Sequence, residues 1–138
     1  MMDSLRATMM IAGSGLEAQT QRMRIISQNV ANANVTGTSP GDDPYQRQTV
    51  SFATEVDRAS GVSMVKVAHT DFDNKPFTVL YDPNHVAADE NGMVKMPNVD
   101  MLLEMADMRE AVRSYEANLQ TAKQARELIS MTIDMIRS

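Results

Sequence analysis

The sequence predicts a mainly α protein in which long N- and C-terminal helices pair as an antiparallel coiled-coil hairpin, with a small β-rich or irregular insertion between them. Three observations predict this fold. Apolar residues recur in steps of four and three at both ends of the chain, all 5 prolines lie between those ends, and the middle alternates apolar and polar residues over short stretches. A narrow apolar seam is stable in water only when it is covered, so each helix needs a partner.

The N-terminal helix is assigned to residues 1–34. Its stripe consists of Leu5, Met9, Ala12, Leu16, Gln19, Met23, Ile26, Val30 and Ala33, with Gln19 as the one polar position. Asp3 or Ser4 is expected to be the N-cap, because a short side-chain oxygen can accept hydrogen bonds from first-turn amides. The helix is expected to stop within residues 32–37, where asparagines and a glycine tolerate the left-handed conformation that ends helices.

The middle region, residues 35–97, is expected to be a different kind of structure. Apolar and polar residues alternate around residues 49–52, 62–68 and 77–81, and a brief apolar run follows at 93–96. Turn-forming residues at 38–44 and 82–92 separate these stretches. The expected strands are short and carry little bulk, so the alternative is an irregular insertion.

The C-terminal helix is assigned to residues 98–138, and no proline or glycine interrupts it after residue 97. Its stripe consists of Met101, Met105, Met108, Val112, Tyr115, Leu119, Ala122, Arg126, Ile129, Ile133 and Ile136, with Arg126 as the one polar break. Charged residues between these positions, such as Glu104 and Asp107, are expected on a solvated outer face. At 1.5 Å per residue, residues 99–136 of this helix span about 56 Å and residues 5–33 of its partner about 43 Å, so the C-terminal helix is expected to extend beyond the partner.

Composition excludes several classes of function. A net charge of −5 argues against binding to nucleic acid and gives no basic face for anionic lipid. The absence of cysteine excludes disulfides, thiolate metal sites and cysteine nucleophiles. Thirteen methionines, with no Trp, suit adaptable helix interfaces better than a rigid core. The N-terminus lacks the apolar core of a cleaved signal peptide, so the chain is expected to stay in the cytosol or to leave by a route that reads no such signal.

Two motifs invite a chemical interpretation. Residues 13–18, GSGLEA, fit the G-x-G-x-x-A form of a dinucleotide-binding turn, but the helical stripe runs straight through them and no acidic residue follows at the required distance. The alternative is that these small residues let another helix approach closely, or kink this helix. His69 and His85 lie among aspartates, but their spacing matches no metal-ligand pattern, and solvated loop residues explain them better. We therefore expect no catalytic residue, cofactor or metal.

Amides give the N-terminal helix an unusual polar surface with few charges. They are Gln19, Gln21, Gln28, Asn29, Asn32 and Asn34. This composition suits burial among other helices through hydrogen bonds, which a free two-helix hairpin does not need.

The chain resembles the bacterial flagellar basal-body rod proteins, and among them the proximal rod members. The N-terminal resemblance lies in residues 13–19 (GSGLEAQ), 22–23 (RM), 26–34 (ISQNVANAN) and 36–37 (TG). In the middle it lies in residues 41–45 (GDDPY), 49–52 (TVSF), 81–85 (YDPNH), 88–89 (AD) and 92–94 (GMV). At the C-terminal end it lies in residues 97–100 (PNVD), 104–108 (EMADM), 113–118 (RSYEAN) and 122–123 (AK). Val35 departs from the family's usual threonine or serine, and Gln46 and Gln48 flank Arg47 where a more basic run is usual.

The resemblance implies a structural subunit of the proximal rod, the helical drive shaft of motility, without catalysis. The two terminal helices would form the inner wall of a tube and the insertion would face outward. The implied partners are further copies of the chain, other rod proteins and the flagellar type III export apparatus, with no nucleic acid, small-molecule substrate or direct lipid binding. The implied location is the basal body in the periplasm, reached without a cleaved signal.

The expected assembly interface combines the two stripes with neighbouring amides. It comprises Leu5, Met9, Leu16, Gln19, Met23, Ile26, Asn29, Asn32, Met105, Met108, Val112, Tyr115, Leu119, Asn118, Arg126, Ile129 and Ile133. The alternative from another class is a cytosolic coiled-coil adaptor that binds a partner helix.

Overall fold

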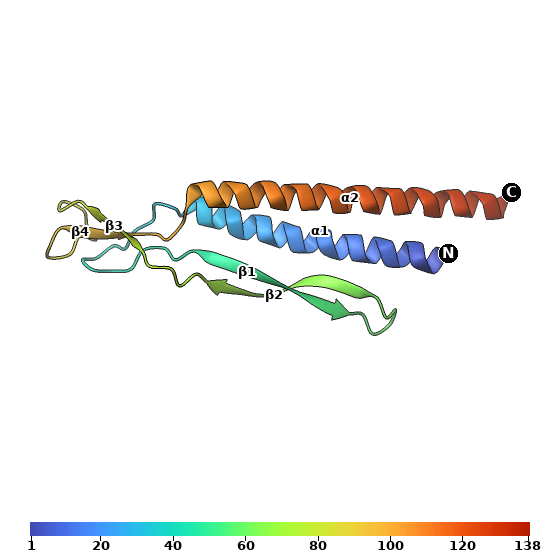
Figure 1. The fold of residues 1–138 in the computed structure, drawn as a ribbon, viewed down its shortest axis with the longest axis horizontal. Coiled ribbons are helices and arrows are strands. Elements are labelled where there is room, and N and C mark those ends of the chain that lie inside the picture. The colour runs from blue at the N-terminus through green and yellow to red at the C-terminus, as the bar shows by residue number, and fades with distance from the viewer. The chain divides into compact units, whose positions relative to one another are not determined.

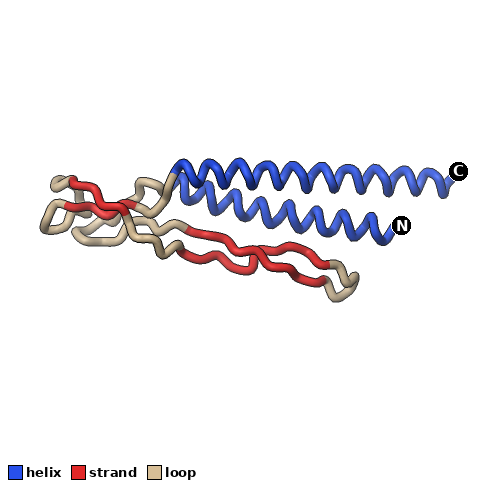
Figure 2. The backbone as a smooth tube through the Cα atoms, viewed as in Figure 1, coloured by secondary structure: helices blue, strands red, loops and turns tan.

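The computed structural model describes all 138 residues. Its elements are α1 (Met2–Ala31), β1 (Gln48–Val56), β2 (Ser63–Phe72), β3 (Thr78–Tyr81), β4 (Met93–Met96) and α2 (Met101–Arg137), labelled in Figure 1. Helix occupies the two ends of the chain and strands and loops occupy the middle (Figure 2). The prediction of two long terminal helices around a small β region is confirmed. Neither α1 nor α2 has a stretch apolar enough to cross a membrane.

The start of α1 differs from the prediction. The helix begins at Met2, and the amide of Leu5 donates to the carbonyl oxygen of Met1 at 3.2 Å. Asp3 and Ser4 therefore lie inside the first turn, and the prediction that one of them is the N-cap is wrong. The helix ends at Ala31, directly before the asparagine-containing run that was expected to stop it.

Helix α2 begins with a side-chain cap. The Asp100 Oδ1 atom accepts hydrogen bonds from the amides of Leu102, at 3.0 Å, and Leu103, at 3.5 Å. Such a cap satisfies first-turn amides that have no partner within the helix, and the negative carboxylate suits the positive end of the helix dipole. Asp100 therefore sets where α2 starts.

The strands form two separate two-stranded sheets, β1 with β2 and β3 with β4. The turn between β1 and β2 is closed by the Asp57 amide, which donates to the Val62 carbonyl oxygen at 2.8 Å. β3 and β4 are antiparallel, with partners running from Thr78 with Met96 to Tyr81 with Met93. β1, β2 and β3 overlap the stretches where alternation predicted strands, at 49–52, 62–68 and 77–81, and β4 coincides with the brief apolar run at 93–96.

The chain divides into two compact units, each built from both ends of the chain and part of the insertion. The first unit comprises Met1–Met23, Ser51–His69 and Arg109–Ser138, and the second comprises Arg24–Val50 and Thr70–Met108. Their interiors differ in kind. The buried apolar residues of the first unit are all alanines: Ala12, Ala18, Ala111 and Ala125. Those of the second unit are Ile25, Ile26, Ala87 and Val94.

Candidate functional site

In the first unit, segments of α1 and α2 lie side by side and approach closely (Figure 1). A Cβ atom at Gly15 would lie 2.7 Å from the Asn118 side-chain amide, so a larger residue cannot occupy this position without displacing Asn118. Arg22 Nη2 and Glu110 Oε2 form an ion pair at 3.4 Å further along the same two helices. The small residues thus bring the two backbones together.

The glycine motif at residues 13–18 lies entirely within α1. Because the segment is continuous helix, it does not form the glycine-rich turn that binds a pyrophosphate. The interpretation that its small residues admit another helix is confirmed at Gly15. Gly13, by contrast, has open space around it.

The least exposed row of side chains on α2, which we call the buried row, does not coincide with the predicted stripe. Each of its members lies one residue before a stripe position. Its members at seven-residue intervals are small or polar: Glu104, Ala111, Asn118, Ala125 and Thr132. The predicted stripe positions Met105, Val112, Leu119, Arg126 and Ile133 each follow one of these by a single residue, and we call these five the flanking row. Met105 is 55% exposed, Val112 38% and Ile133 44%. Arg126, the one polar residue of the predicted stripe, is also exposed. It therefore belongs to the flanking row and does not place a charge in the buried row.

The other predicted interface residues are better covered. Ile26 and Asn29 are buried. The half-buried ones are Leu5, Met9, Leu16, Gln19, Met23, Asn32, Met108, Tyr115, Asn118, Leu119 and Ile129. The oxygen of the Gln19 side chain is buried without a hydrogen-bond donor.

Further large apolar side chains are exposed on α2 beyond the flanking row. They include Leu102 at 80%, Leu128 at 50%, Met131 at 61% and Ile136 at 76%. Scattered apolar residues are normal on a surface, but many on one helix mark a surface that another protein covers. The arrangement therefore leaves α2 with exposed apolar side chains on more than one side, which suits association.

The second unit holds a buried charged cluster centred on Arg47. Its guanidinium Nε donates to Glu104 Oε1, its Nη1 lies 3.1 Å from Asp73 Oδ2, and its Nη2 lies 3.5 Å from Asp107 Oδ2. Glu104 is 0% exposed. The prediction that Glu104 lies on a solvated outer face is therefore wrong, because its position on α2 coincides with the buried row. Its charge is tolerated in the interior because a guanidinium pairs with it.

An asparagine completes the cluster from α1. The Asn29 Nδ2 atom donates to the Gln48 carbonyl oxygen at 2.9 Å and to Glu104 Oε2 at 3.5 Å. Its Oδ1 atom accepts from the Tyr45 hydroxyl at 2.7 Å and from the Gln48 amide at 2.9 Å. The buried amide thus has two donors and two acceptors around it, and it connects the end of α1 to the segment that leads into β1.

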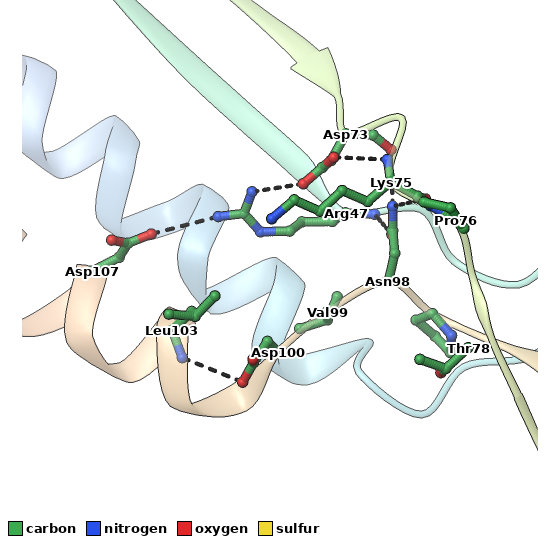
Figure 3. Close-up of a pocket in the computed structure, with 11 residues that line it drawn as sticks. Arg47, Asp73, Lys75, Pro76, Thr78, Asn98, Val99, Asp100, Leu103 and Asp107 are labelled. Carbon is green, nitrogen blue, oxygen red and sulfur yellow. Dashed lines mark hydrogen bonds and ion pairs between the residues drawn. The ribbon is translucent and has the colours of Figure 1, made fainter.

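A second asparagine, Asn98, binds the backbone amide of Arg47 (Figure 3). Asn98 Oδ1 accepts from the Arg47 amide at 2.7 Å, and its Nδ2 donates to the carbonyl oxygens of Asp73, at 2.9 Å, and Lys75, at 3.0 Å. These groups line an open cleft of about 350 Å³, with Pro97 and Leu103 among its apolar walls. Arg47 of the cleft is paired with both Asp73 and Asp107, so the cluster connects separate segments of the second unit.

The electrostatics favour charged forms within this cluster. The hydrogen bond from the Lys75 amide lowers the pKa of Asp73 against the opposing effect of burial, and Arg47 lowers it further. Burial by itself lowers the pKa of Arg47, but the hydrogen bonds and charges of Glu104 and Asp73 outweigh this and raise it. Burial raises the pKa of Tyr45, and the Glu104 carboxylate adds to that rise. Arg47 is thus a permanent cation, and Tyr45 stays a neutral donor.

Sequence reasoning missed this cluster because its members lie far apart in the chain. Arg47 and Glu104 are separated by 57 residues, and no local period connects them. A signal was available on α2, where Glu104 precedes Ala111, Asn118 and Ala125 at intervals of seven, a row of small and polar residues that admits close packing.

The two histidines have separate surroundings. His69 lies exposed in β2. In the second unit, His85 Nδ1 accepts a hydrogen bond from the Ala87 amide at 3.0 Å, and its Nε2 lies 3.3 Å from Thr36 Oγ1. His85 therefore joins two loop segments of its own unit.

Two family models match the chain at its two ends. Residues 9–37 match the model described as flagella basal body rod protein, and residues 90–135 match the C-terminal model of the flagellar basal body rod FlgEFG proteins. These ranges contain most of α1 and most of α2.

Curated relatives match over almost the whole chain. The flagellar basal-body rod protein FlgC of Agrobacterium fabrum is 57% identical over 137 residues, which is 99% of each chain. FlgC of Salmonella typhimurium is 37% identical over 91% of this chain and 92% of its own, and FlgC of Borreliella burgdorferi is 37% identical over 78% and 82%.

Fold, exposed helix face and relatives together define a structural protein of the bacterial flagellum, which is not an enzyme. The chain belongs to the FlgC family of flagellar basal-body rod proteins. It is a structural subunit of the basal-body rod and assembles with copies of itself and other rod components.

Proposed function

We propose that the chain is a proximal rod subunit in which α1 and α2 pair as an antiparallel coiled coil and the insertion of residues 35–97 faces outward. The observation that carries the proposal is the exposure of the apolar residues Met105, Val112 and Ile133 in the flanking row of α2, because exposed large apolar side chains on one helix need a covering surface. The neighbours that cover it are further copies of the chain and other rod proteins.

Two contacts in the first unit support the antiparallel arrangement. Gly15 faces Asn118, and Arg22 pairs with Glu110, so position increases along α1 while it decreases along α2. A seam of small residues makes this contact close but contributes little apolar burial. Fully burying a large apolar side chain stabilises by about 1.5–3 kcal/mol, so assembly is expected to supply stability that the free subunit lacks.

The free subunit is accordingly expected to have frayed helix ends and to gain helix on assembly. Circular dichroism of dilute and assembled protein measures this difference. A dilute subunit that already shows all of the assembled helix content would contradict the proposal.

A charge in the covered surface should block rod formation. We expect Val112→Glu, in the flanking row, to abolish swimming and intact basal bodies, and Leu16→Glu and Ile129→Glu to do the same. The matched control is Gln120→Glu, an exposed position of α2 outside the flanking row, which should leave both unchanged. Immunoblots establish equal abundance of each variant, and electron micrographs score basal bodies. A motile strain carrying Val112→Glu at normal abundance would refute the interface.

We further propose that the subunit reaches the periplasm through the flagellar type III export apparatus without a cleaved signal. The family membership supports this route, and the net charge of −5 supports the absence of nucleic-acid and anionic-lipid partners. Intact mass measurement of subunits from purified basal bodies tests the first point, since a cleaved leader would shorten the chain. Recovery of the protein from the cytosol alone, with none in basal bodies, would favour a cytosolic adaptor.

A further inference from the structure

The exposed apolar surface of α2 is rich in methionine. Met101 is 46% exposed, Met105 55%, Met131 61% and Met135 77%. Each pair is spaced by four residues, so its two thioethers are neighbours on the helix surface. By contrast, Met23, Met64, Met93, Met96 and Met108 are all half-buried.

The chain contains no cysteine, the side chain that competes most strongly for mild oxidants. The thioether sulfur of methionine is the next group to react, and its rate depends on access to solvent. The four exposed methionines of α2 are therefore the positions along this helix where an oxidant reaches sulfur most easily.

We propose that Met101, Met105, Met131 and Met135 are modification sites at which a hydroperoxide oxidises the unassembled subunit, and that the resulting sulfoxides prevent its assembly. The sulfur attacks one oxygen of the peroxide, a sulfur–oxygen bond forms and the oxygen–oxygen bond breaks. Sulfur loses two electrons to become the sulfoxide, and hydrogen peroxide is reduced to water. The effect on assembly rests on the proposed function.

The physical reason is the polarity of the product. A sulfoxide carries a strong hydrogen-bond acceptor where the thioether was apolar, and burying it without a donor is unfavourable. Among the side chains next to these methionines, Leu102, 80% exposed, and Leu128, 50% exposed, are apolar and cannot donate a hydrogen bond to a sulfoxide. Assembly that covers the four methionines also shields them from the oxidant. Free subunits are therefore oxidised, whereas subunits within finished rods are not. Sulfoxide reductases reverse the modification.

The first experiment needs only the free full-length subunit. The folded protein is treated with hydrogen peroxide without denaturant, digested, and the sulfoxide content of each methionine is followed by mass spectrometry. Met101, Met105, Met131 and Met135 should oxidise several-fold faster than the half-buried Met23, Met64, Met93, Met96 and Met108. Equal rates for the two groups would overturn the proposal.

The second experiment measures assembly. Sedimentation velocity compares self-association of untreated protein, peroxide-treated protein and treated protein after incubation with sulfoxide reductases. Treatment should abolish self-association, and reduction should restore it. A variant with leucine at all four positions should self-associate after treatment, whereas a control variant with leucine at Met23, Met64, Met93 and Met96 should remain sensitive, because leucine conserves the volume of methionine.

The outcomes separate this inference from the function on which it rests. Treated wild-type protein that assembles as well as untreated protein would overturn the inference alone. If untreated protein shows no self-association at any concentration, that result counts against the proposed assembly through α2, while the oxidation rates still decide the modification sites.

Discussion

The two units of the molecule are stabilised in different ways. The first unit brings helix segments together through Gly15 and four buried alanines, so its large apolar residues remain at the surface. The second unit encloses a charged and amide-rich cluster around Arg47, with Glu104 completely buried. Small residues permit a close contact but bury little apolar area, whereas a hydrogen-bonded cluster holds particular segments in one arrangement.

Because of this difference, the two units have different roles within the subunit. Buried ion pairs seldom add much net stability compared with apolar residues of similar size, but removing one partner is costly because the other remains buried and unpaired. The cluster of the second unit therefore serves to define how its strands and helix ends meet. Under the proposed function, the exposed apolar side chains of the first unit are the ones that contact neighbouring subunits.

Removing the central cation should have the largest effect. Arg47→Ala leaves Glu104 buried without its partner, and we expect the free energy of unfolding to fall by about 3–5 kcal/mol. Urea unfolding followed by circular dichroism measures the loss. Arg58→Ala, at an exposed position, is the matched control and should change stability by less than about 0.5 kcal/mol.

A double variant shows whether the loss comes from the uncompensated charge. Arg47→Leu combined with Glu104→Leu should be less destabilised than Arg47→Leu alone, because the fully buried Glu104 carboxylate is no longer present without a partner. If the double variant is less stable than Arg47→Leu alone, the cluster stabilises the protein through its own favourable interactions. The loss in Arg47→Leu would then not come from the unpaired Glu104 carboxylate.

A methyl group at Gly15 should have a smaller effect and should act on the first unit. Gly15→Ala forces Asn118 to move and strains its hydrogen bond to the Ser114 carbonyl oxygen, so we expect this variant to be about 1–3 kcal/mol less stable than Gly13→Ala. Gly13→Ala is the matched control, because Gly13 has open space and alanine is favoured over glycine in a helix by about 1 kcal/mol.

The close contact also predicts a rescue. Shortening the opposing side chain with Asn118→Ala should recover most of the stability lost by Gly15→Ala, which thermal unfolding can measure. If the second substitution recovers nothing, the two helices do not meet at this pair in solution.

Acid should weaken the second unit through Asp73. The folded-state pKa of this carboxyl lies below its ordinary value of 3.8. Between these two pKa values the unfolded chain binds more protons than the folded one, so stability rises with pH there. The contribution is fully present above pH 3.8 and is lost as pH falls through the folded pKa. Asp73→Asn should flatten the stability profile in this window, and an unchanged slope would contradict the assignment.

The smallest effect is expected at the surface ion pair of β1 and β2. Lys66 Nζ lies 3.1 Å from Glu55 Oε2, and both side chains are 53% exposed. Lys66→Ala should cost between about 0 and 1 kcal/mol, because water screens exposed pairs. Repeating the measurement in high salt should abolish the difference; a loss comparable to that of Arg47→Ala would contradict the ranking of the two kinds of ion pair.

Local patterns were sufficient to predict the elements of this fold. Steps of four and three place two long helices at the ends, and short alternating stretches predict three of the four strands between them, since both signals depend on neighbouring residues alone. The first turn of α1 was predicted less well. Asp3 and Ser4 are good caps by residue type, but the helix continues past them to Met2, because a favourable cap does not oblige a helix to start there.

The sequence by itself determined the two helices, the strands and membership of the flagellar rod proteins, because periodicity and motif are properties of the chain. Only the tertiary structure decided which side of α2 is buried. Apolar content favoured Met105, Val112 and Ile133, yet the buried positions are Glu104, Ala111 and Ala125. The physical reason is that the residues packed against α2 determine which of its rows is buried. Gly15 brings one backbone close to Asn118, and Arg47, 57 residues before Glu104 in the chain, neutralises the Glu104 carboxylate.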